Sequence, residues 1–364
     1  MGNKLLDKDT SLQLSLLKLF ACIGVVYIHG YTLHFNYFTI NSENMPVVYY
    51  VQTIISQYIS RVAVPIFFAV SGYIYAVKNY QDSSWQFMWR KARGVLLPYM
   101  LWNSIAIFYI FLAQIPDVTR RCFTEPLIIS NFTAARWLES YVGLGNVWFP
   151  FLYPLWFLPY LFAAFMIVHV FRKYFYKYEY LVLILALLNI ASTMYIPLKT
   201  LCGEWGPFLR LIYAVSFFTL GMYLVKHREW VVKKKIMLTS GIVFVAASAA
   251  NIMDFTRKVD LSPLTWYIGL FFMFSFTSHV GKCGDKVKKA IAFLSVFSFL
   301  IYVTHEYMMT VIIKLLYPNL PAKTWCLVLP YLFVPIIVMS VLITGGWILK
   351  KVLPKVYDFL FSTH

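Results

Sequence analysis

Long apolar runs are the feature that most limits how this chain can fold. Several of them approach the ~20 residues that an α-helix needs to cross a hydrocarbon layer of about 30 Å. They are apolar around the whole helical circumference and lack the alternation of a membrane β-barrel. With 60% hydrophobic and 13% charged residues and a mean hydropathy of +0.68, a water-soluble domain is excluded. We therefore expect an all-α, polytopic integral membrane protein.

About ten membrane-spanning helices are predicted, at 12–33, 56–77, 95–115, 154–172, 179–197, 207–225, 236–252, 262–280, 290–312 and 326–349. No linker or low-complexity tract separates them, so 1–364 is interpreted as one transmembrane domain. The long connection 116–150 carries Arg120, Arg121, Arg136, Trp137 and Trp148. Because long irregular segments in compact domains usually serve a function, this extracytoplasmic loop is predicted to be a lid or recognition segment.

The distribution of positive charge predicts the orientation in the membrane. With the N-terminus in the cytoplasm, the cytoplasmic segments hold 21 Lys and Arg residues and the opposite side holds 8. This excess follows the positive-inside rule and places both termini in the cytoplasm. The formal net charge of +17 is therefore assigned to topology and lipid headgroups, and no nucleic-acid partner is expected. The five cysteines show no metal-binding spacing, so no metal is expected.

Two ionisable side chains lie within the first predicted span. The stretch KLFACIGVVYIHG (18–30) begins with Lys18 and reaches His29 eleven residues later. At 1.5 Å and 100° per residue, the two lie roughly 16 Å apart along the axis and about 20° apart around it. Ionisable groups at membrane depth usually face a bundle interior or a water-filled path. The alternative is that Lys18 snorkels to the surface and His29 only hydrogen-bonds a neighbouring helix.

Further basic side chains are predicted at related depths. Arg61 and His305 fall in the same outer third of the membrane as His29, which indicates a shared polar cavity. On the cytoplasmic side, Arg90 and Arg93 lie one helical turn apart, a spacing suited to forked hydrogen bonds with phosphates. This pair is a weak signal alone, because cytoplasmic loops are basic in general. Arg210, within the sixth span, has no assigned role.

Several motifs in order resemble membrane acyltransferase family 3, over nearly the whole chain. They are the basic residue and histidine eleven positions apart in the first span, PIFFAVSGY (65–73), the arginine pair followed by Pro98 and Tyr99, LWFLPYL (155–161) and IYVTHEYM (301–308). The resemblance implies an enzyme of the cell membrane that transfers an acyl group, commonly acetyl. The donor would be cytoplasmic acyl-coenzyme A, and the acceptor a hydroxyl of an extracytoplasmic glycan or lipid-linked sugar.

The resemblance, together with the matched depth of the basic side chains, suggests roles for individual residues. The catalytic set is His29, His305 and Arg61, and the substrate-binding set is Lys18, Arg90, Arg93, Ser71, Tyr99, Trp156 and Glu306. A neutral His29 would act as general base towards the acceptor hydroxyl, and Arg61 would stabilise a developing oxyanion or bind an anionic acceptor. No permanently bound cofactor is expected. The partners are the donor, the acceptor and membrane lipids.

The chain departs from the family pattern at two positions. Lys18 stands where the family usually has arginine, and Ser15 where it usually has aspartate, so the donor contact can differ in geometry. Ser71 precedes Gly72, and for this serine helix packing is favoured over substrate binding despite its motif position. A fused extracytoplasmic domain is not expected.

The main alternative is a membrane transporter of a glycan or small solute. Coupled carriers typically bind their ion through intramembrane carboxylates, and the predicted spans offer only Glu306. A structural scaffold would not need histidines at matched depth.

Overall fold

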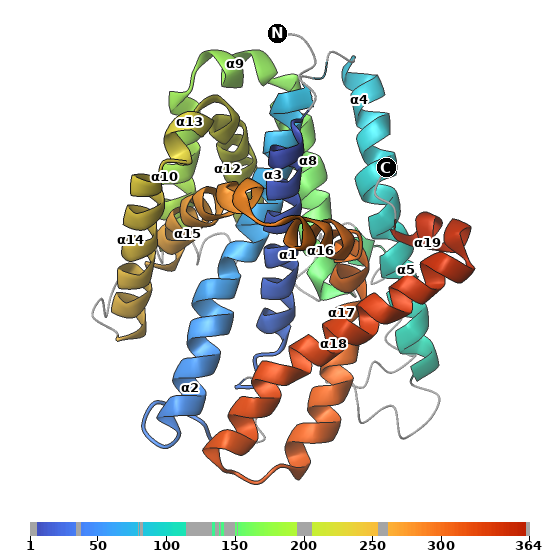
Figure 1. Ribbon diagram of the computed structural model, residues 1–364. Helices are drawn as coiled ribbons and strands as arrows, with labels where there is room; N and C mark the ends of the chain where they lie inside the picture. The colour runs from blue at the N-terminus through green and yellow to red at the C-terminus, as the bar shows by residue number, and fades with distance from the viewer. Residues whose placement is uncertain are drawn as a thin grey trace. The chain divides into compact units, whose positions relative to one another are not determined.

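The computed structural model of the protein describes residues 6–33, 38–78, 80, 83–113, 133–134, 138, 140–141, 150, 152–194, 206–253 and 261–361. Every regular element in these ranges is helical, as predicted (Figure 1). The proposed recognition residues of the long connection (Arg120, Arg121, Arg136, Trp137 and Trp148) lie outside the described residues.

Within the described ranges, seven helical segments are long and apolar enough to cross a membrane, whereas the sequence predicts ten. They are Lys8–His29, Pro46–Lys78, Tyr153–Val170, Pro207–Lys226, Lys234–Ile252, Ser298–Asn319 and Thr324–Val352. The other three predicted spans are also helical, and in the described residues they comprise 17, 15 and 16 residues: α5 (Leu97–Ala113), α10 (Tyr180–Met194) and α15 (Ser262–Thr277). The cytoplasmic location of the termini stays a prediction.

The first helix, α1 (Lys8–His29), has a side-chain cap at its beginning. Asp7 accepts hydrogen bonds at 2.7 Å from the backbone N–H and the hydroxyl of Thr10, which satisfies an N–H that the helix itself leaves without a partner. These bonds hold the pKa of Asp7 below its ordinary value. The helix ends at His29, four residues before the predicted end at 33, so this histidine occupies the last turn.

The second predicted span begins ten residues earlier than expected and is irregular at its centre. It consists of α2 (Pro46–Gln52), the π-helix η1 (Thr53–Ile59), the 3-10 turn η2 (Ser60–Val62) and α3 (Ala63–Lys78). Pro65 has no N–H to donate to the carbonyl four residues before it, at Arg61, which accounts for the break in the regular ladder at η2. Short π and 3-10 stretches inside helices often mark functional positions.

The predicted ninth span, 290–312, is interrupted. The structure has α16 (Asp285–Ser295), then a break, and then α17 (Ser298–Leu316). Only Ile291 of α16 is buried, and its first turns carry three lysines, Lys286, Lys288 and Lys289. The apolar residues from 290 to 295 therefore belong to an amphipathic helix and not to the start of a span.

The helices form two compact units. Unit 1 comprises Met1–Val25, Gln57–Lys91 and Tyr160–Ser298. It contains most of α1, the end of η1, η2, α3, α4 (Ser84–Lys91), most of α8 (Phe157–Val170), α9 (Arg172–Lys177), α10, α12 (Pro207–Lys226), α13 (Arg228–Val231), α14 (Lys234–Ile252), α15, η6 (Ser278–Lys282) and α16. At its centre α3 and α12 cross closely. A Cβ on Gly72 would lie 1.8 Å from the carbonyl oxygen of Phe218, and one on Gly221 would lie 1.9 Å from that of Ala69.

Unit 2 comprises Val26–Ser56, Ala92–Pro159 and Phe299–His364. It contains α2, η3 (Ala92–Leu96), α5, η5 (Tyr153–Trp156), nearly all of α17, η7 (Tyr317–Asn319), α18 (Thr324–Val352) and α19 (Pro354–Phe361). Buried hydroxyls join its helices: Ser56 donates to the carbonyl of Tyr27 at 2.6 Å, and its Oγ lies 2.8 Å from the hydroxyl of Tyr331. Such bonds are expected in lipid, because polar groups there have no water to bind.

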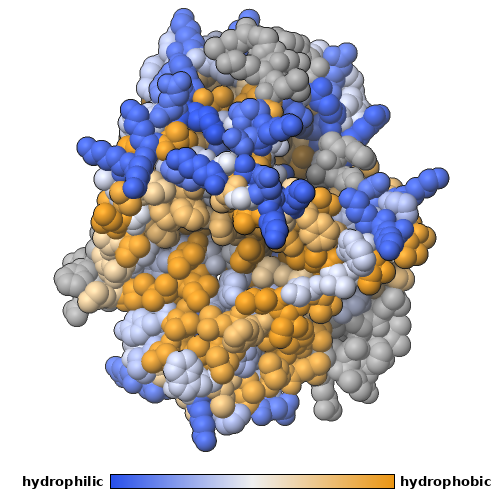
Figure 2. All heavy atoms as spheres, in the orientation of Figure 1, coloured by the Kyte–Doolittle hydropathy of each residue, from blue (hydrophilic) through white to orange (hydrophobic). Residues whose placement is uncertain are grey.

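Large apolar side chains are exposed on several helices, for example Leu187 of α10, Ile242 of α14 and Ile337 of α18. Figure 2 shows that hydrophobic residues cover much of the visible face. In a soluble protein such a surface would be an aggregation hazard, whereas lipid tails solvate it. The exposed apolar surface therefore agrees with a multi-pass membrane protein.

Candidate active site

Two histidines and a carboxylate meet in unit 2, where the last turn of α1 lies beside α17. The rings of His29 and His305 have their centroids 5.0 Å apart at an interplanar angle of 68°. Nδ1 of His29 lies 3.9 Å from Oε1 of Glu306, within ion-pair distance. The geometry thus brings together His29 and His305, two of the three basic residues predicted to share a polar cavity, and adds Glu306 to them.

His305 is the most enclosed member of this cluster, with none of its surface exposed. Its Nδ1 lies 2.9 Å from the carbonyl oxygen of Ile301, one turn earlier in α17. A carbonyl can only accept, so Nδ1 carries the proton and Nε2 is left with a lone pair. Nε2 is buried and has no hydrogen-bond partner among the described residues. A buried imidazole nitrogen without a partner is costly for folding, so a functional role is a reasonable explanation for its presence.

Glu306 is held from a third element that sequence reasoning missed. The backbone of Tyr153, in η5, hydrogen-bonds its carboxylate, and the ring of Tyr153 lies 6.3 Å from that of His29. The hydroxyl of Tyr302 donates to the carbonyl of Pro154, which ties η5 to α17. The side chains of Glu306 and His29 are 20% and 18% exposed, whereas Oε2 of Glu306 is buried and has no hydrogen-bond partner among the described residues.

The comparison with known families decides the class of protein. Residues 11–345 match the family described as an acyltransferase domain, acyltransferase family 3. The chain belongs to this family. Neither the curated proteins nor the solved structures contain a significant match. With its apolar helices, the acyltransferase is a multi-pass membrane enzyme.

Two other predicted residues of the acyltransferase lie in unit 1. Arg61, on η2, has an exposed side chain that donates from Nε and Nη2 to Oε1 of Gln57 at 3.1 and 2.7 Å. Lys18 is half-buried in the middle of α1. The catalytic role of Arg61 and the donor role of Lys18 stay predictions.

Three of the predicted substrate-binding residues have structural contacts. The hydroxyl of Ser71 donates to the carbonyl of Phe67 at 2.8 Å, one turn earlier in α3. The buried hydroxyl of Tyr99 lies 3.0 Å from the carbonyl oxygen of Ser140. Trp156 is half-buried and is the last residue of η5, the turn that begins at Tyr153. Substrate binding by these residues stays a prediction.

The predicted phosphate-binding arginines are both on the surface. Arg90 ends α4 and lies with its guanidinium carbon 4.3 Å from the ring centroid of Tyr80. Arg93 lies in η3, three residues later. Arg210, to which the sequence assigns no role, hydrogen-bonds the hydroxyl of Tyr160. No group of metal-binding side chains occurs in the described part of the chain.

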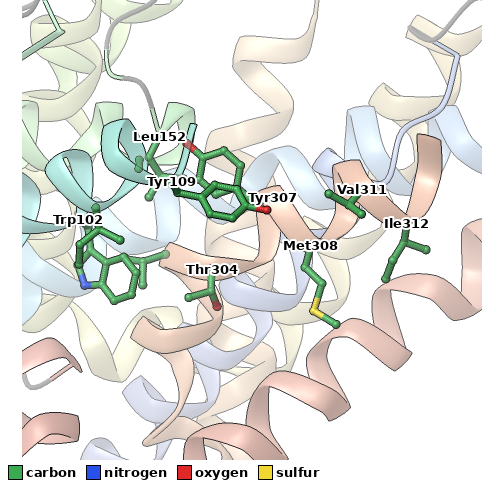
Figure 3. Close-up of a pocket in the computed structure, with 11 residues that line it drawn as sticks. Trp102, Tyr109, Leu152, Thr304, Tyr307, Met308, Val311 and Ile312 are labelled. Carbon is green, nitrogen blue, oxygen red and sulfur yellow. The ribbon is translucent and has the colours of Figure 1, made fainter. Parts of the chain in front are cut away.

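The other face of α17 lines an apolar groove in unit 2. The groove has a volume of about 500 Å³ and lies between α5 and α17 (Figure 3). Its lining residues are Trp102, Ile105, Ala106, Tyr109, Leu152, Val303, Thr304, Tyr307, Met308, Val311 and Ile312. The hydroxyl of Thr304 in the groove wall donates to the carbonyl of Leu300 at 2.7 Å. The ring centroids of Tyr109 and Tyr307 lie 5.1 Å apart. The groove suits a hydrocarbon and not a sugar.

Proposed function

We propose that this membrane acyltransferase is an O-acyltransferase, most simply an O-acetyltransferase. Acyl-coenzyme A is its cytoplasmic donor, and a hydroxyl of an extracytoplasmic glycan or lipid-linked sugar is its acceptor. The observation that carries the proposal is the His29–His305–Glu306 cluster on a chain of the acyltransferase family. The surface arginines at 90 and 93 supply positive charge suited to the donor phosphates.

The geometry supports His29 as the residue that moves the proton. A carboxylate beside Nδ1 favours the tautomer with the proton on that nitrogen, which leaves the Nε2 lone pair for the acceptor hydroxyl. The distance of 3.9 Å is longer than a hydrogen bond, as is common before substrate binds. The buried Nε2 of His305 accepts a hydrogen bond from the acceptor and orients it.

The chemical step exchanges a thioester for an oxygen ester. His29 takes the proton of the acceptor hydroxyl while its oxygen bonds to the acyl carbon. The carbon–sulfur bond then breaks, and the imidazolium returns the proton to the departing thiolate of coenzyme A. The step consumes no oxidant or other co-reactant, so donor and acceptor suffice.

The test is acyl transfer by the purified protein in proteoliposomes. With radiolabelled acetyl-coenzyme A outside and membrane extract from the native cell as acceptor source, label should enter a product that mild alkali releases, as an O-ester does. Coenzyme A should appear in equal amount. Donor that remains intact under these conditions, with protein that is folded, would contradict the proposal and favour the transporter alternative.

The apolar groove predicts a preference for a lipid-linked acceptor. Val311→Trp should fill part of the 500 Å³ groove and lower labelling of the lipid-extractable fraction about tenfold or more, because the hydrocarbon loses its place. Leu315→Trp is the matched control, since Leu315 is on the same helix, exposed, and outside the groove. Equal labelling by the two variants would remove the groove from acceptor binding.

A further inference from the structure

Two buried polar side chains of unit 2 hold the end of α1, where this helix carries His29. Gln52, the last residue of α2, and Ser56, in η1, have none of their surface exposed. Polar groups buried inside a membrane protein are costly unless they are hydrogen-bonded, so each is expected to make a specific contact. Both of them bond to the short segment that surrounds His29 in the sequence.

Gln52 contacts the residue that follows the end of the helix. Its Oε1 accepts a hydrogen bond at 2.9 Å from the backbone N–H of Thr32, three residues after His29. A backbone N–H only donates, so the oxygen of the amide must face it, which settles the orientation of the Gln52 side chain. Nε2 of Gln52 then donates at 2.9 Å to Oγ1 of Thr32. The amide thus binds both the backbone and the side chain of Thr32.

Ser56 contacts the last turn of the helix itself. Its hydroxyl donates at 2.6 Å to the carbonyl of Tyr27, two residues before His29. The last carbonyls of an α-helix lack the N–H groups that would continue the regular ladder, and here the N–H of Gly30 lies 3.2 Å from the same carbonyl. Since the proton of Ser56 points to Tyr27, its oxygen accepts from the hydroxyl of Tyr331, on α18. The last turn is thereby joined to η1 and to α18.

The same segment packs against the helix that carries the rest of the histidine cluster. A Cβ on Gly30 would lie 3.2 Å from Cε of Met309. Met309 is buried on α17 and follows His305 by four residues, so the two share a helix face. Gln52 and Ser56 therefore fix α1 at the point where it meets the face of α17 that bears His305.

The position of His29 at the end of a helix makes these contacts important for the cluster. Helix ends fray more readily than helix centres, so the last residue depends on groups outside the helix for its place. A base must lie within hydrogen-bond reach of the proton that it takes, and a misplacement of about 1 Å can cost roughly 10²-fold in rate. The separations of His29 from Glu306 and His305 leave little room for such a shift.

We propose that Gln52 and Ser56 are positioning residues for acyl transfer, which fix residues 27–32 so that the imidazole of His29 faces Glu306 and His305. The inference rests on the proposed function, in which His29 is the base. Neither side chain touches the reacting atoms, and both act through the backbone of α1. The π-helix η1 begins at residue 53, between the two, and such helices are frequent at functional sites.

The first measurement is steady-state acyl transfer in proteoliposomes, with acetyl-coenzyme A as the varied substrate and membrane extract as the acceptor source. Gln52→Met has a similar length but no donor or acceptor. It should lower kcat about tenfold or more and leave KM for acetyl-coenzyme A unchanged, because the base is displaced while the donor contacts are not. Gln52→Glu, as a neutral acid, keeps one donor and one acceptor in place of the amide and should recover part of the rate.

Ser56→Ala is the second variant and removes fewer contacts. It should lower kcat severalfold, again without a change in KM, because the carbonyl of Tyr27 keeps only the bond from Gly30. This smaller change carries the test if Gln52→Met is not recovered as folded protein.

A matched control separates positioning from a general loss of stability. Ser216 of α12, in unit 1, is also fully buried, and its Oγ lies 2.5 Å from the hydroxyl of Tyr267 on α15. Ser216→Ala removes the same kind of contact as Ser56→Ala and should lower the unfolding temperature by a similar amount, but kcat should stay within about twofold. Equal losses of kcat in the two variants would make the effect one of stability and overturn the proposal.

The outcomes also separate this inference from the proposed function. If wild type transfers acyl groups, and folded Gln52→Met and Ser56→Ala proteins keep its kcat, the positioning role is wrong while His29 stays the proposed base. If both variants raise KM for acetyl-coenzyme A at unchanged kcat, the end of α1 serves donor binding, and the positioning role is again overturned. Folded wild type that transfers nothing would refute the proposed function, and the positioning role with it.

Discussion

Replacing His29 by alanine should lower the rate of acyl transfer by a factor of 10²–10⁴, the usual contribution of a general base. The side chain of His29 lies close to both Glu306 and His305. Among the described residues of the cluster, His29 is the base that has a carboxylate beside it, so its removal leaves the hydroxyl proton without this acceptor. The measurement is the initial rate of alkali-labile labelling in proteoliposomes. Donor binding should be unchanged, because the loss concerns the transition state.

The control for this experiment is another histidine of the same protein. His279, in η6 of unit 1, is half-buried and contacts only nearby groups, with Nδ1 3.1 Å from the carbonyl oxygen of Ser275. His279→Ala should retain transfer within about twofold. Wild-type rates for a folded His29→Ala protein would make the histidine a packing residue and refute the mechanism.

Glu306 should behave differently from His29. Glu306→Gln keeps the shape and the hydrogen bond from the backbone of Tyr153 but removes the charge beside Nδ1. We expect kcat to fall about tenfold or more with KM for the donor unchanged, because the carboxylate positions the base and stabilises the imidazolium. A rise in KM alone would instead assign Glu306 to substrate binding.

Much of this site follows from the sequence because it depends on helical spacing. Hydropathy assigns His29 and His305 to separate apolar segments, and their similar predicted depths are enough to place them in one polar cavity. The contact of Tyr153 could not be predicted, since η5 is a short turn whose position depends on the tertiary bond from Tyr302 to Pro154. A hydrogen bond from a backbone N–H does not depend on the type of side chain, so the sequence carries no pattern that predicts it.

The differences between the predicted and observed helices have one physical origin. Hydropathy measures how apolar a segment is but not where its helix ends, and helix ends depend on caps and on neighbouring packing. The break between α16 and α17 and the early start at Pro46 are of this kind. The bonds of Gln52 and Ser56 to the end of α1 escape prediction for a related reason: they join residues that are 20 and 29 positions apart in the sequence.

The largest loss of stability is expected at the crossing of α3 and α12. Gly72 faces Phe218 while Gly221 faces Ala69, so the two pairs run in opposite order and the helices cross antiparallel. The atoms a new Cβ would meet, at 1.8 and 1.9 Å, are backbone carbonyl oxygens, which cannot rotate away as a side chain would. Gly72→Ala or Gly221→Ala must therefore push two helices apart and lose the contacts between them.

We expect each of these variants to lose roughly 3 kcal/mol or more of stability, at the upper end of overpacking effects. The readout is the temperature at which the detergent-solubilised protein loses its monodisperse peak in size-exclusion chromatography. It should fall by about 5 °C or more, or no folded protein should be recovered. Gly345→Ala is the matched control: this glycine lies in α18, and a Cβ there would meet nothing within 4 Å. The control should be neutral or slightly stabilising, because alanine favours the helix. If Gly72→Ala melted like Gly345→Ala, the close crossing of α3 and α12 would be wrong, and with it the packing role assigned to the neighbouring Ser71.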